Sequence, residues 1–297
     1  MSFEIKSNNT VKDISKWNTI SSYKELANNS DGIIIRLAYR GNSTGNITAD
    51  PKAKTHLKEL LENECKIGIY FFTNAINERE AEEEAEYCLN YIKENNIELS
   101  FPIIIDTEYG NNNHTGRADN LSKNVRTNCV KAFINKCNEN GYYAAIYASD
   151  SWFINNLNYN EIKDIPKWVA KYNPNKKIKF AKDNVLGLQY TSKGNCPGVI
   201  GNIDESDWYV NIGEGIKIEE NKSPIKVRPF KDGEKIKIDN VNLYSSSTTE
   251  KVSGIKSGTF YIWNKTKRNG RVRITTKPEY VKELGKVTGW VNCTDII

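Results

Sequence analysis

The chain has 297 residues, of which 38% are hydrophobic and 27% charged, as in an ordinary water-soluble globular protein. This length suffices for one large domain and a small one. No stretch approaches the roughly 18 apolar residues of a membrane-spanning helix, and the first residues, MSFEIKSNNT, lack the apolar core of a secretory signal peptide. We therefore expect a protein that is made in the cytoplasm, is not stably inserted in a membrane, and reaches any external target only after release.

Positive charge is concentrated near the C-terminus. The net charge is +5, but residues 222–297 contain 16 Lys and Arg against 7 Asp and Glu, which leaves −4 for the preceding residues. This division indicates two domains with different roles. A basic C-terminal domain suits an anionic partner, and charge alone does not choose among a cell-wall polymer, a nucleic acid and a membrane surface.

Predicted strands and helices alternate from residue 11 to about 173. The predicted strands are rich in Ile, Val and Tyr, and they are VKDIS, GIIIRLAY, KIGIYFF, FPIIID and YYAAIYA. Asp50-Pro51 supplies a cap and a first-turn proline for one helix. The apolar faces of the next two helices contain Ala81, Ala85, Cys88, Leu89 and Ile92, and then Leu121, Val125, Cys129, Phe133 and Cys137 before Gly141.

The rhythm changes after Tyr147, because the predicted strands KWVAKY, VLGLQYT and VIGNID have no long amphipathic helix between them. About eight strands and five helices indicate an α/β fold, an irregular (β/α) TIM-like barrel whose last part lacks helices. A doubly wound open sheet is the alternative. We assign the barrel to residues 1–210, a polar linker to 211–223, and a small all-β domain with short strands and Gly, Asn and Ser turns to 224–297.

The cysteines and histidines show no pattern of a metal site or a disulfide framework. Cys129 and Cys137 lie eight residues apart on one predicted helix, about 12 Å along its axis, too far for a disulfide. We expect all six cysteines to be free thiols. His56 is predicted to be exposed on a helix and His114 to lie in a loop near the strand FPIIID. No metal or organic cofactor is expected, which argues against a zinc amidase.

Polar residues gather where the predicted strands end, and this is where a (β/α) barrel places its site. Asp106 and Glu108 point to the same face because side chains alternate along a strand. Four carboxylates and seven further side chains stand at such ends: Asp13, Asp106, Glu108 and Asp204, with Arg36, Tyr70, Phe72, Tyr147, Trp168, Tyr172 and Gln189. Aromatic faces stack on sugar rings, and a carboxylic acid with a raised pKa can protonate a glycosidic oxygen. The set predicts a site that cleaves carbohydrate.

Each of these residues also has a structural interpretation. Asp106 and Glu108 can be a solvated strand end, Asp13 a helix cap and Asp204 a turn residue. Trp168 and Tyr172 can be core aromatics.

Seven segments occur in an order that resembles the family 25 glycoside hydrolases, the lysozyme-like muramidases of phage endolysins and bacterial autolysins. They are DISKWN at 13–18, GIYFF at 68–72, DTE at 106–108, IYASDSWF at 146–153, WVAKY at 168–172, LQYTSKG at 188–194 and NIDES at 202–206. The resemblance covers roughly residues 10–210. It implies an irregular (β/α) barrel and net retention, with the nucleophile left open between the enzyme and the substrate's N-acetyl group.

The resemblance also implies roles for the four carboxylates. Glu108 would be the general acid, and Asp106 would set its proton affinity and orient the substrate. Asp13 and Asp204 would line the cleft and stabilise the oxocarbenium charge. Two positions depart from the family pattern: Phe71 stands where a histidine is common, and Glu205-Ser206 follow Asp204 in place of the usual D-x-N.

The closing segment GWVNCTDII, after a run of short strands, resembles a bacterial SH3-like wall-binding domain. Its exposed-looking Tyr261, Trp263 and Trp290, with Arg271 and Arg273, either hold a wall glycan or peptide or form the core of a small barrel. Nucleic acid is not favoured, because the basic residues match no known fingerprint.

The sequence as a whole predicts an endolysin-type peptidoglycan hydrolase that cleaves the β-1,4 bond between N-acetylmuramic acid and N-acetylglucosamine. The C-terminal domain is expected to bind a cell-wall polymer, and the oligomeric state stays open. The alternatives are a bacterial autolysin, another glycosidase specificity such as glucosaminidase or chitinase, and a wall-binding protein without catalysis.

Overall fold

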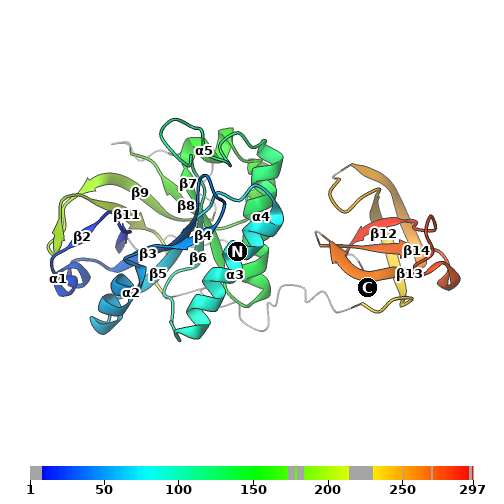
Figure 1. The fold of residues 1–297 in the computed structure, drawn as a ribbon, viewed down its shortest axis with the longest axis horizontal. Coiled ribbons are helices and arrows are strands. Elements are labelled where there is room, and N and C mark those ends of the chain that lie inside the picture. Colours follow the sequence, from blue (N-terminus) through cyan, green and yellow to red (C-terminus); the bar gives the residue numbers. More distant parts are fainter. Residues whose placement is uncertain are drawn as a thin grey trace. The chain divides into compact units, whose positions relative to one another are not determined.

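The computed structural model describes residues 9–172, 178, 184–213, 230–249, 251–268, 270–293 and 296. The chain divides into two compact units, Met1–Ser223 and Pro224–Ile297 (Figure 1). Most of the predicted linker, residues 214–223, lies outside the described residues. No helix in the described ranges is both long enough and apolar enough to cross a membrane.

Eight strands of the larger unit close into a barrel. In order around it they are β1 (Asn9–Ile14), β3 (Gly32–Arg40), β5 (Ile67–Phe72), β6 (Ile103–Asp106), β7 (Ala144–Ser149), β8 (Lys167–Ala170), β9 (Val185–Gly194) and β11 (Ile203–Trp208), which returns to β1. Neighbours from β1 to β9 run parallel, whereas β11 is antiparallel to both β9 and β1. The predicted irregular barrel is confirmed, and the open sheet is excluded.

Three short strands lie outside this barrel. β4 (Ile47–Ala49) extends the sheet beyond β3, and β2 (Thr19–Ile20) pairs with β10 (Val199–Ile200). The segment VIGNID, predicted as one strand, is therefore divided between β10 and the start of β11. Gly201 lies at the break with a φ of 89°, a left-handed conformation that glycine adopts without strain.

Six helices occur among the described residues of the larger unit. They are α1 (Tyr23–Asn28), α2 (Ala53–Glu62), α3 (Glu78–Glu94), α4 (Lys123–Glu139), α5 (Asp150–Asn155) and α6 (Tyr159–Ile162). Four of them begin at a Ser or Asn whose side chain accepts a backbone N–H of the first turn: Ser22, Asn77, Ser122 and Ser149. The predicted inner face of α3 is confirmed, since its five apolar residues are buried.

Three predictions about the helices were wrong. Val125 is 37% exposed, because α4 turns Arg126, Thr127 and Val130 toward the barrel. Asp50 does not cap α2, whose N-cap is Lys52. His56 is only 1% exposed. It lies on the buried stripe of α2 with Leu57 and Leu60, and hydrogen bonds to the Tyr23 hydroxyl (2.8 Å) and the Ser15 carbonyl (3.3 Å) offset its burial.

The apolar residues of the barrel strands form two separate layers. Ile33, Ile35, Ile103 and Ile105 face the helices. Ile34 and Ile104, by alternation, face the barrel interior with Val11, Phe101, Ala145, Trp168, Leu186 and Trp208. Asp106 follows Ile104 by two residues and thus continues the inward-facing row. The alternation that directs Ile104 into the interior therefore also directs the Asp106 carboxylate inward at the C-terminal end of β6.

Three glycines make room for the aromatic rings of this interior. A Cβ atom on Gly68 would lie 2.8 Å from the Cβ of Phe101, and one on Gly187 would overlap the indole of Trp208. Phe101 packs edge-on against Trp208, with ring centroids 5.1 Å apart. Gly32 on β3 also makes room, since a Cβ there would lie 2.5 Å from the Phe101 ring. Large rings fit in the interior because these strand positions have no side chain.

We expect Gly68→Ala to lower the free energy of unfolding by about 1–3 kcal/mol, the usual cost of overpacking a core. Urea denaturation followed by tryptophan fluorescence measures this loss. Gly254→Ala is the matched control, because a Cβ there meets nothing within 4 Å. Equal unfolding midpoints for the two variants would contradict the packing argument.

The smaller unit is a closed barrel of four strands: β12 (Lys235–Tyr244), β13 (Val252–Arg268), β14 (Arg271–Thr275) and β15 (Gly289–Asn292). A short 3₁₀ helix, η2 (Pro278–Tyr280), precedes β15. The core contains Ile236, Ile238, Ile262, Val272, Ile274 and Val291. Trp263 is only 5% exposed, which agrees with the second of its two interpretations, a core residue, whereas Tyr261 and Trp290 are half-buried. All six cysteines are free thiols, as predicted.

Candidate active site

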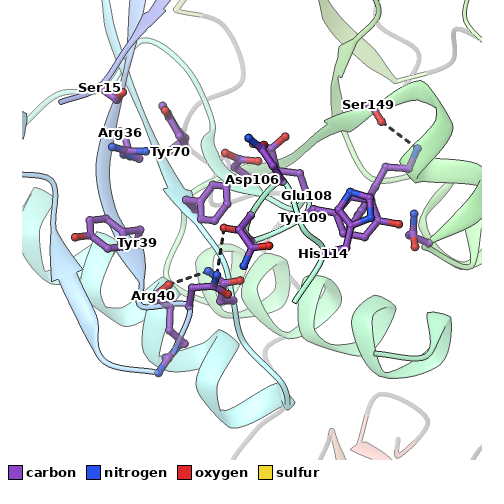
Figure 2. A pocket seen from close by; sticks show the side chains of 18 of the residues that line it. Ser15, Arg36, Tyr39, Arg40, Tyr70, Asp106, Glu108, Tyr109, His114 and Ser149 are labelled. Carbon is purple, nitrogen blue, oxygen red and sulfur yellow. Dashed lines mark hydrogen bonds between the residues drawn. The ribbon is translucent and has the colours of Figure 1, made fainter. Parts of the chain in front are cut away.

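A pocket of about 1000 Å³ opens at the end of the barrel where the parallel strands finish. Figure 2 shows Asp106 and Glu108 in its middle, Arg36 and Tyr39 on one side, and Tyr109 and His114 on the other. Six of the eleven predicted site residues line it: Arg36, Tyr70, Phe72, Asp106, Glu108 and Asp204. The pocket thus brings together three of the four predicted carboxylates.

The antiparallel strand β11 explains how Asp204 reaches this end of the barrel. Its N-terminal residues lie beside the C-terminal residues of β1, and Asp204 pairs directly with Asp13. The sequence analysis took Asp204 for a residue at the end of a strand, but it lies near the start of one. The position was predicted correctly, and the direction of the strand was not.

The carboxyl groups hold their protons more tightly than isolated ones. Burial, and then the neighbouring charge of Asp204 or Glu108, raises the pKa of Asp13 and of Asp106 well above the ordinary range. The side chain of Glu108 is open to the pocket, yet the surrounding walls and the charge of Asp204 raise its pKa to about 7, while Arg36 opposes the shift. Burial raises the pKa of Asp204 to about 6. The cluster therefore keeps a carboxylic acid available near neutral pH.

Gln189 connects Asp13 to two tyrosines behind the pocket. Its Nε2 donates to Asp13 Oδ2 (2.8 Å), and its Oε1 accepts hydrogen bonds from the hydroxyls of Tyr147 (2.8 Å) and Tyr172 (2.7 Å). Gln189 is 2% exposed and Asp13 is 6% exposed. These residues orient one another around Asp13, so Gln189 supports the site from behind and does not line the pocket.

Trp168 lies deeper still, in the barrel interior. It is 1% exposed, and its Nε1 donates to Ser206 Oγ (3.0 Å). The direct stacking on substrate that we expected of Trp168 is not compatible with this burial, and the core interpretation applies. Tyr172 is 57% exposed and does not belong to the pocket lining.

Asp50 holds one wall of the pocket in place. It is 3% exposed, and its Oδ2 accepts hydrogen bonds from Arg36 Nε (2.8 Å) and from the backbone N–H of Lys16 (3.0 Å). Arg36 Nη2 forms an ion pair with the same oxygen (2.8 Å). Its Oδ1 accepts the N–H of Lys52 (2.9 Å). Arg36 is thereby fixed beside the carboxylates. The dipeptide Asp50-Pro51 gave no signal for this role, because the partner Arg36 comes from another strand.

Several aromatic pocket residues were missed by the sequence analysis. Trp17 is 77% exposed and belongs to the quoted segment DISKWN, and Tyr109 directly follows Glu108 and is 39% exposed. Tyr109 stacks on His114, with ring centroids 3.5 Å apart, and meets Trp152 edge-on at 4.7 Å. Adjacency to the recognised motifs was the signal that pointed to Trp17 and Tyr109.

The two departures from the family pattern do not reach the pocket. Phe71 is fully buried and packs against Tyr87 on α3, because it alternates with the inward-facing Tyr70 and Phe72. Ser206, which stands in place of the Asn of D-x-N, is fully buried, and its Oγ accepts a hydrogen bond from Trp168 Nε1 (3.0 Å). Both side chains are engaged away from the pocket.

This arrangement is that of an enzyme that cleaves glycosidic bonds. A protonated carboxyl group, neighbouring carboxylates and exposed aromatic faces meet in one pocket large enough for sugar rings. Within the described ranges, no group of three or more His, Cys, Asp or Glu is arranged to hold a metal ion. The profile of glycosyl hydrolases family 25 matches residues 12–199, and the chain belongs to this family. No curated protein matches the chain significantly.

Solved structures agree with the family. The modular autolysin LytC from Streptococcus pneumoniae, in complex with a synthetic peptidoglycan ligand, is 27% identical over 68% of this chain, with a TM-score of 0.60. This match covers 46% of LytC, so the chain spans about half the length of that relative. The CTP1L endolysin is 25% identical over 68% of this chain and 66% of its own, with a TM-score of 0.54. The Clostridium perfringens spore cortex lytic enzyme SleM shares the fold over 98% of this chain and 86% of its own, at 15% identity and a TM-score of 0.58.

The raised pKa of Glu108 predicts how activity depends on pH. A general acid must be protonated, so kcat/KM should fall as pH rises through about 7. The charge of Asp204 raises this pKa, and Asp204→Asn should therefore move the fall to lower pH. Initial rates of glycan cleavage between pH 4 and 9 test both statements. An unmoved basic limb in Asp204→Asn would contradict the coupling.

Proposed function

We propose that the chain is a peptidoglycan hydrolase that cleaves the β-1,4 bond between N-acetylmuramic acid and N-acetylglucosamine. One observation carries this proposal: Glu108, with a pKa raised to about 7, opens into a pocket that also contains Asp106 and Asp204. Membership of glycosyl hydrolases family 25 supports it, as does the likeness to LytC, which was solved with a peptidoglycan ligand. The likeness to the CTP1L endolysin favours a lytic role.

In the proposed reaction Glu108 acts as the general acid. Its proton passes to the glycosidic oxygen as the bond from C1 to that oxygen breaks, and a water molecule finally supplies the hydroxyl group at C1. Asp106, the last residue of β6, lies beside Glu108 in the pocket and would orient the substrate. The proton affinity of Glu108 is kept high by burial and by the charge of Asp204. Asp204 lines the pocket, where it would stabilise the positive charge that develops on the sugar ring, and Asp13 lies behind it, paired across β1 and β11.

The walls of the pocket offer surfaces for sugar rings. Trp17 and Tyr109 are exposed and line it, and Tyr39 lies on the same side as Arg36 (Figure 2). Asparagines and serines from several loops, from the end of β7 and from α5 add hydrogen-bonding groups: Asn42, Asn74, Asn111, Asn112, Asn155, Asn156, Ser149 and Ser151. Flat apolar faces among amide and hydroxyl groups suit N-acetylated sugars.

Glu108→Gln should lower kcat by about 10²–10⁴-fold, because the amide cannot donate the proton. Digested peptidoglycan is reduced with borohydride, and the new ends are identified. Muramitol at these ends is the expected product of the unmodified protein. Glu94→Gln, an exposed change at the end of α3, should keep full activity.

Other outcomes of this experiment decide against parts of the proposal. Near-normal activity of Glu108→Gln would remove Glu108 from the role of acid. Glucosaminitol at the new ends would move the cut to the other glycosidic bond. An absence of new ends, together with firm binding to the wall, would favour a wall-binding protein without catalysis.

For the C-terminal barrel we propose binding of a cell-wall polymer. On the outer face of β14 the Arg271 guanidinium lies over Tyr244 (3.5 Å to the ring centroid) and donates to Asn292 Oδ1 (3.0 Å) and the Thr249 carbonyl (2.6 Å). Arg273 is half-buried and lies over Trp263 (4.2 Å) and Trp290 (5.1 Å), and within the described ranges its guanidinium has no carboxylate partner. The charge of Arg273 is therefore available for an anionic group of the wall, while the donors of Arg271 are occupied.

In the Glu108→Gln background, which binds without digesting, Arg273→Gln should raise the Kd for purified cell walls about tenfold. This is the scale of one charge-assisted hydrogen bond. A sedimentation assay with the full chain measures it. Arg268→Gln, which removes the same charge from an exposed position of β13, should change Kd little. An equal rise in Kd for both variants would mean that the net charge of the barrel, and not a specific contact of Arg273, determines binding.

A further inference from the structure

Three cationic side chains line the pocket, and two of them are already paired. Arg36 binds Asp50 (2.8 Å). Arg40 is 4% exposed and binds Glu84 (2.7 Å). The ammonium of Lys16 has no carboxylate partner and no hydrogen bond among the residues that the structure describes. Lys16 is therefore the pocket cation whose charge remains available to a ligand.

The position of Lys16 is well defined. Its backbone N–H donates to the buried Asp50 (3.0 Å), and the preceding Ser15 N–H donates to Asn18 Oδ1 (2.9 Å). Its Nζ lies over the ring of Trp17 (4.7 Å to the centroid) and over that of Tyr39 (5.2 Å). These cation–π contacts hold the ammonium beside the two aromatic faces and leave its N–H donors free.

The opposite wall of the pocket differs in character. There the loop after β6 contributes Asn111 and Asn112, with the stack of Tyr109 and His114, and the end of β7 and the start of α5 contribute Ser149 and Ser151. Neither lysine nor arginine from these segments lines the pocket. The acid cluster lies between the two walls (Figure 2). A polymer bound across the cluster thus meets an ammonium on one side and amide and hydroxyl groups on the other.

We propose that Lys16 is a specificity-determining residue that binds a carboxylate of the substrate, carried by the muramyl unit or its stem peptide, above Trp17 and Tyr39. This inference rests on the proposed function. Stem peptides carry free carboxylates, whereas a chitin chain carries none. An ammonium between sugar-stacking faces therefore distinguishes the two polymers and sets the side of the cut on which the peptide-bearing sugar lies.

The test compares two forms of one substrate. Soluble, uncrosslinked glycan strands with intact stem peptides are used as prepared, or after carbodiimide and ammonia have converted their carboxylates to amides. An ion pair in a solvent-open pocket contributes about 1 kcal/mol, or about fivefold. The unmodified protein should therefore show about fivefold higher kcat/KM on the native strands, through a lower KM. The preference should weaken as salt is added.

Three variants complete the test. Lys16→Gln should bring the ratio between the two substrates close to one by raising KM on native strands, with kcat unchanged. Lys16→Arg keeps the charge and should keep most of the preference. Lys58→Gln removes an exposed lysine of α2 that pairs with Glu62 (3.7 Å), and should leave the ratio unchanged. Thermal melting checks that the variants remain folded.

The outcomes separate this inference from the function on which it rests. If Lys16→Gln slows both substrates equally, or if the unmodified protein does not distinguish them, the role of Lys16 is refuted while the hydrolase stands. If the unmodified protein produces no reducing ends from either substrate, the proposed hydrolase itself fails, and this inference fails with it.

Discussion

The closure of the large barrel by one antiparallel strand is the constraint on which the site depends. β11 hydrogen-bonds to β1 on one side and to β9 on the other, and runs against both. Its first residues therefore meet the last residues of β1, and Asp204 comes to lie beside Asp13. A parallel strand in this place would carry its start, and Asp204 with it, to the far end of the barrel. Burial raises the pKa values of these carboxyl groups, and the charge of Asp204, which adds to this for Asp13 and Glu108, is present because of this reversal.

Around the carboxylates, some residues line the pocket and others fix the positions of the site residues by hydrogen bonds. Asp50 secures Arg36 and the backbone of Lys16, and Gln189 secures Asp13. Both supporting side chains are almost fully buried, and each is satisfied by several partners. Because repulsion among carboxylates acts to push them apart, a site of this kind needs rigid supports. Because Asp50 and Gln189 come from parts of the chain that are distant in sequence, the site is ordered only when the whole barrel is folded.

Much of the fold and part of the site could be predicted from local sequence. The run of three isoleucines, Ile103–Ile105, indicates a strand that is buried on both faces. The spacing of two residues between Asp106 and Glu108 predicted that both side chains lie on the pocket side. The sequence could not show whether Trp168 lies in the interior or in the pocket. An inward-facing residue does one or the other according to its position along the barrel axis. His56 was misjudged because its polarity was weighed above its place on an apolar stripe. The partners that make its burial tolerable, Tyr23 and Ser15, lie more than thirty residues away.

The barrel wall also separates two populations of side chains that alternate along every strand. Phe71, one of the positions where this chain departs from its family, packs against Tyr87 of α3, away from the pocket. A change there is compensated by the neighbouring helix, while the adjacent inward positions Tyr70 and Phe72 keep their surroundings. The wall thus separates the outward-facing residues, which must pack against helices, from the inward-facing residues, which must shape the interior and the pocket. Proteins of this fold can therefore change their outward-facing residues in response to temperature or medium without changing the inward-facing ones. An engineer can redesign the outward-facing residues on the same basis.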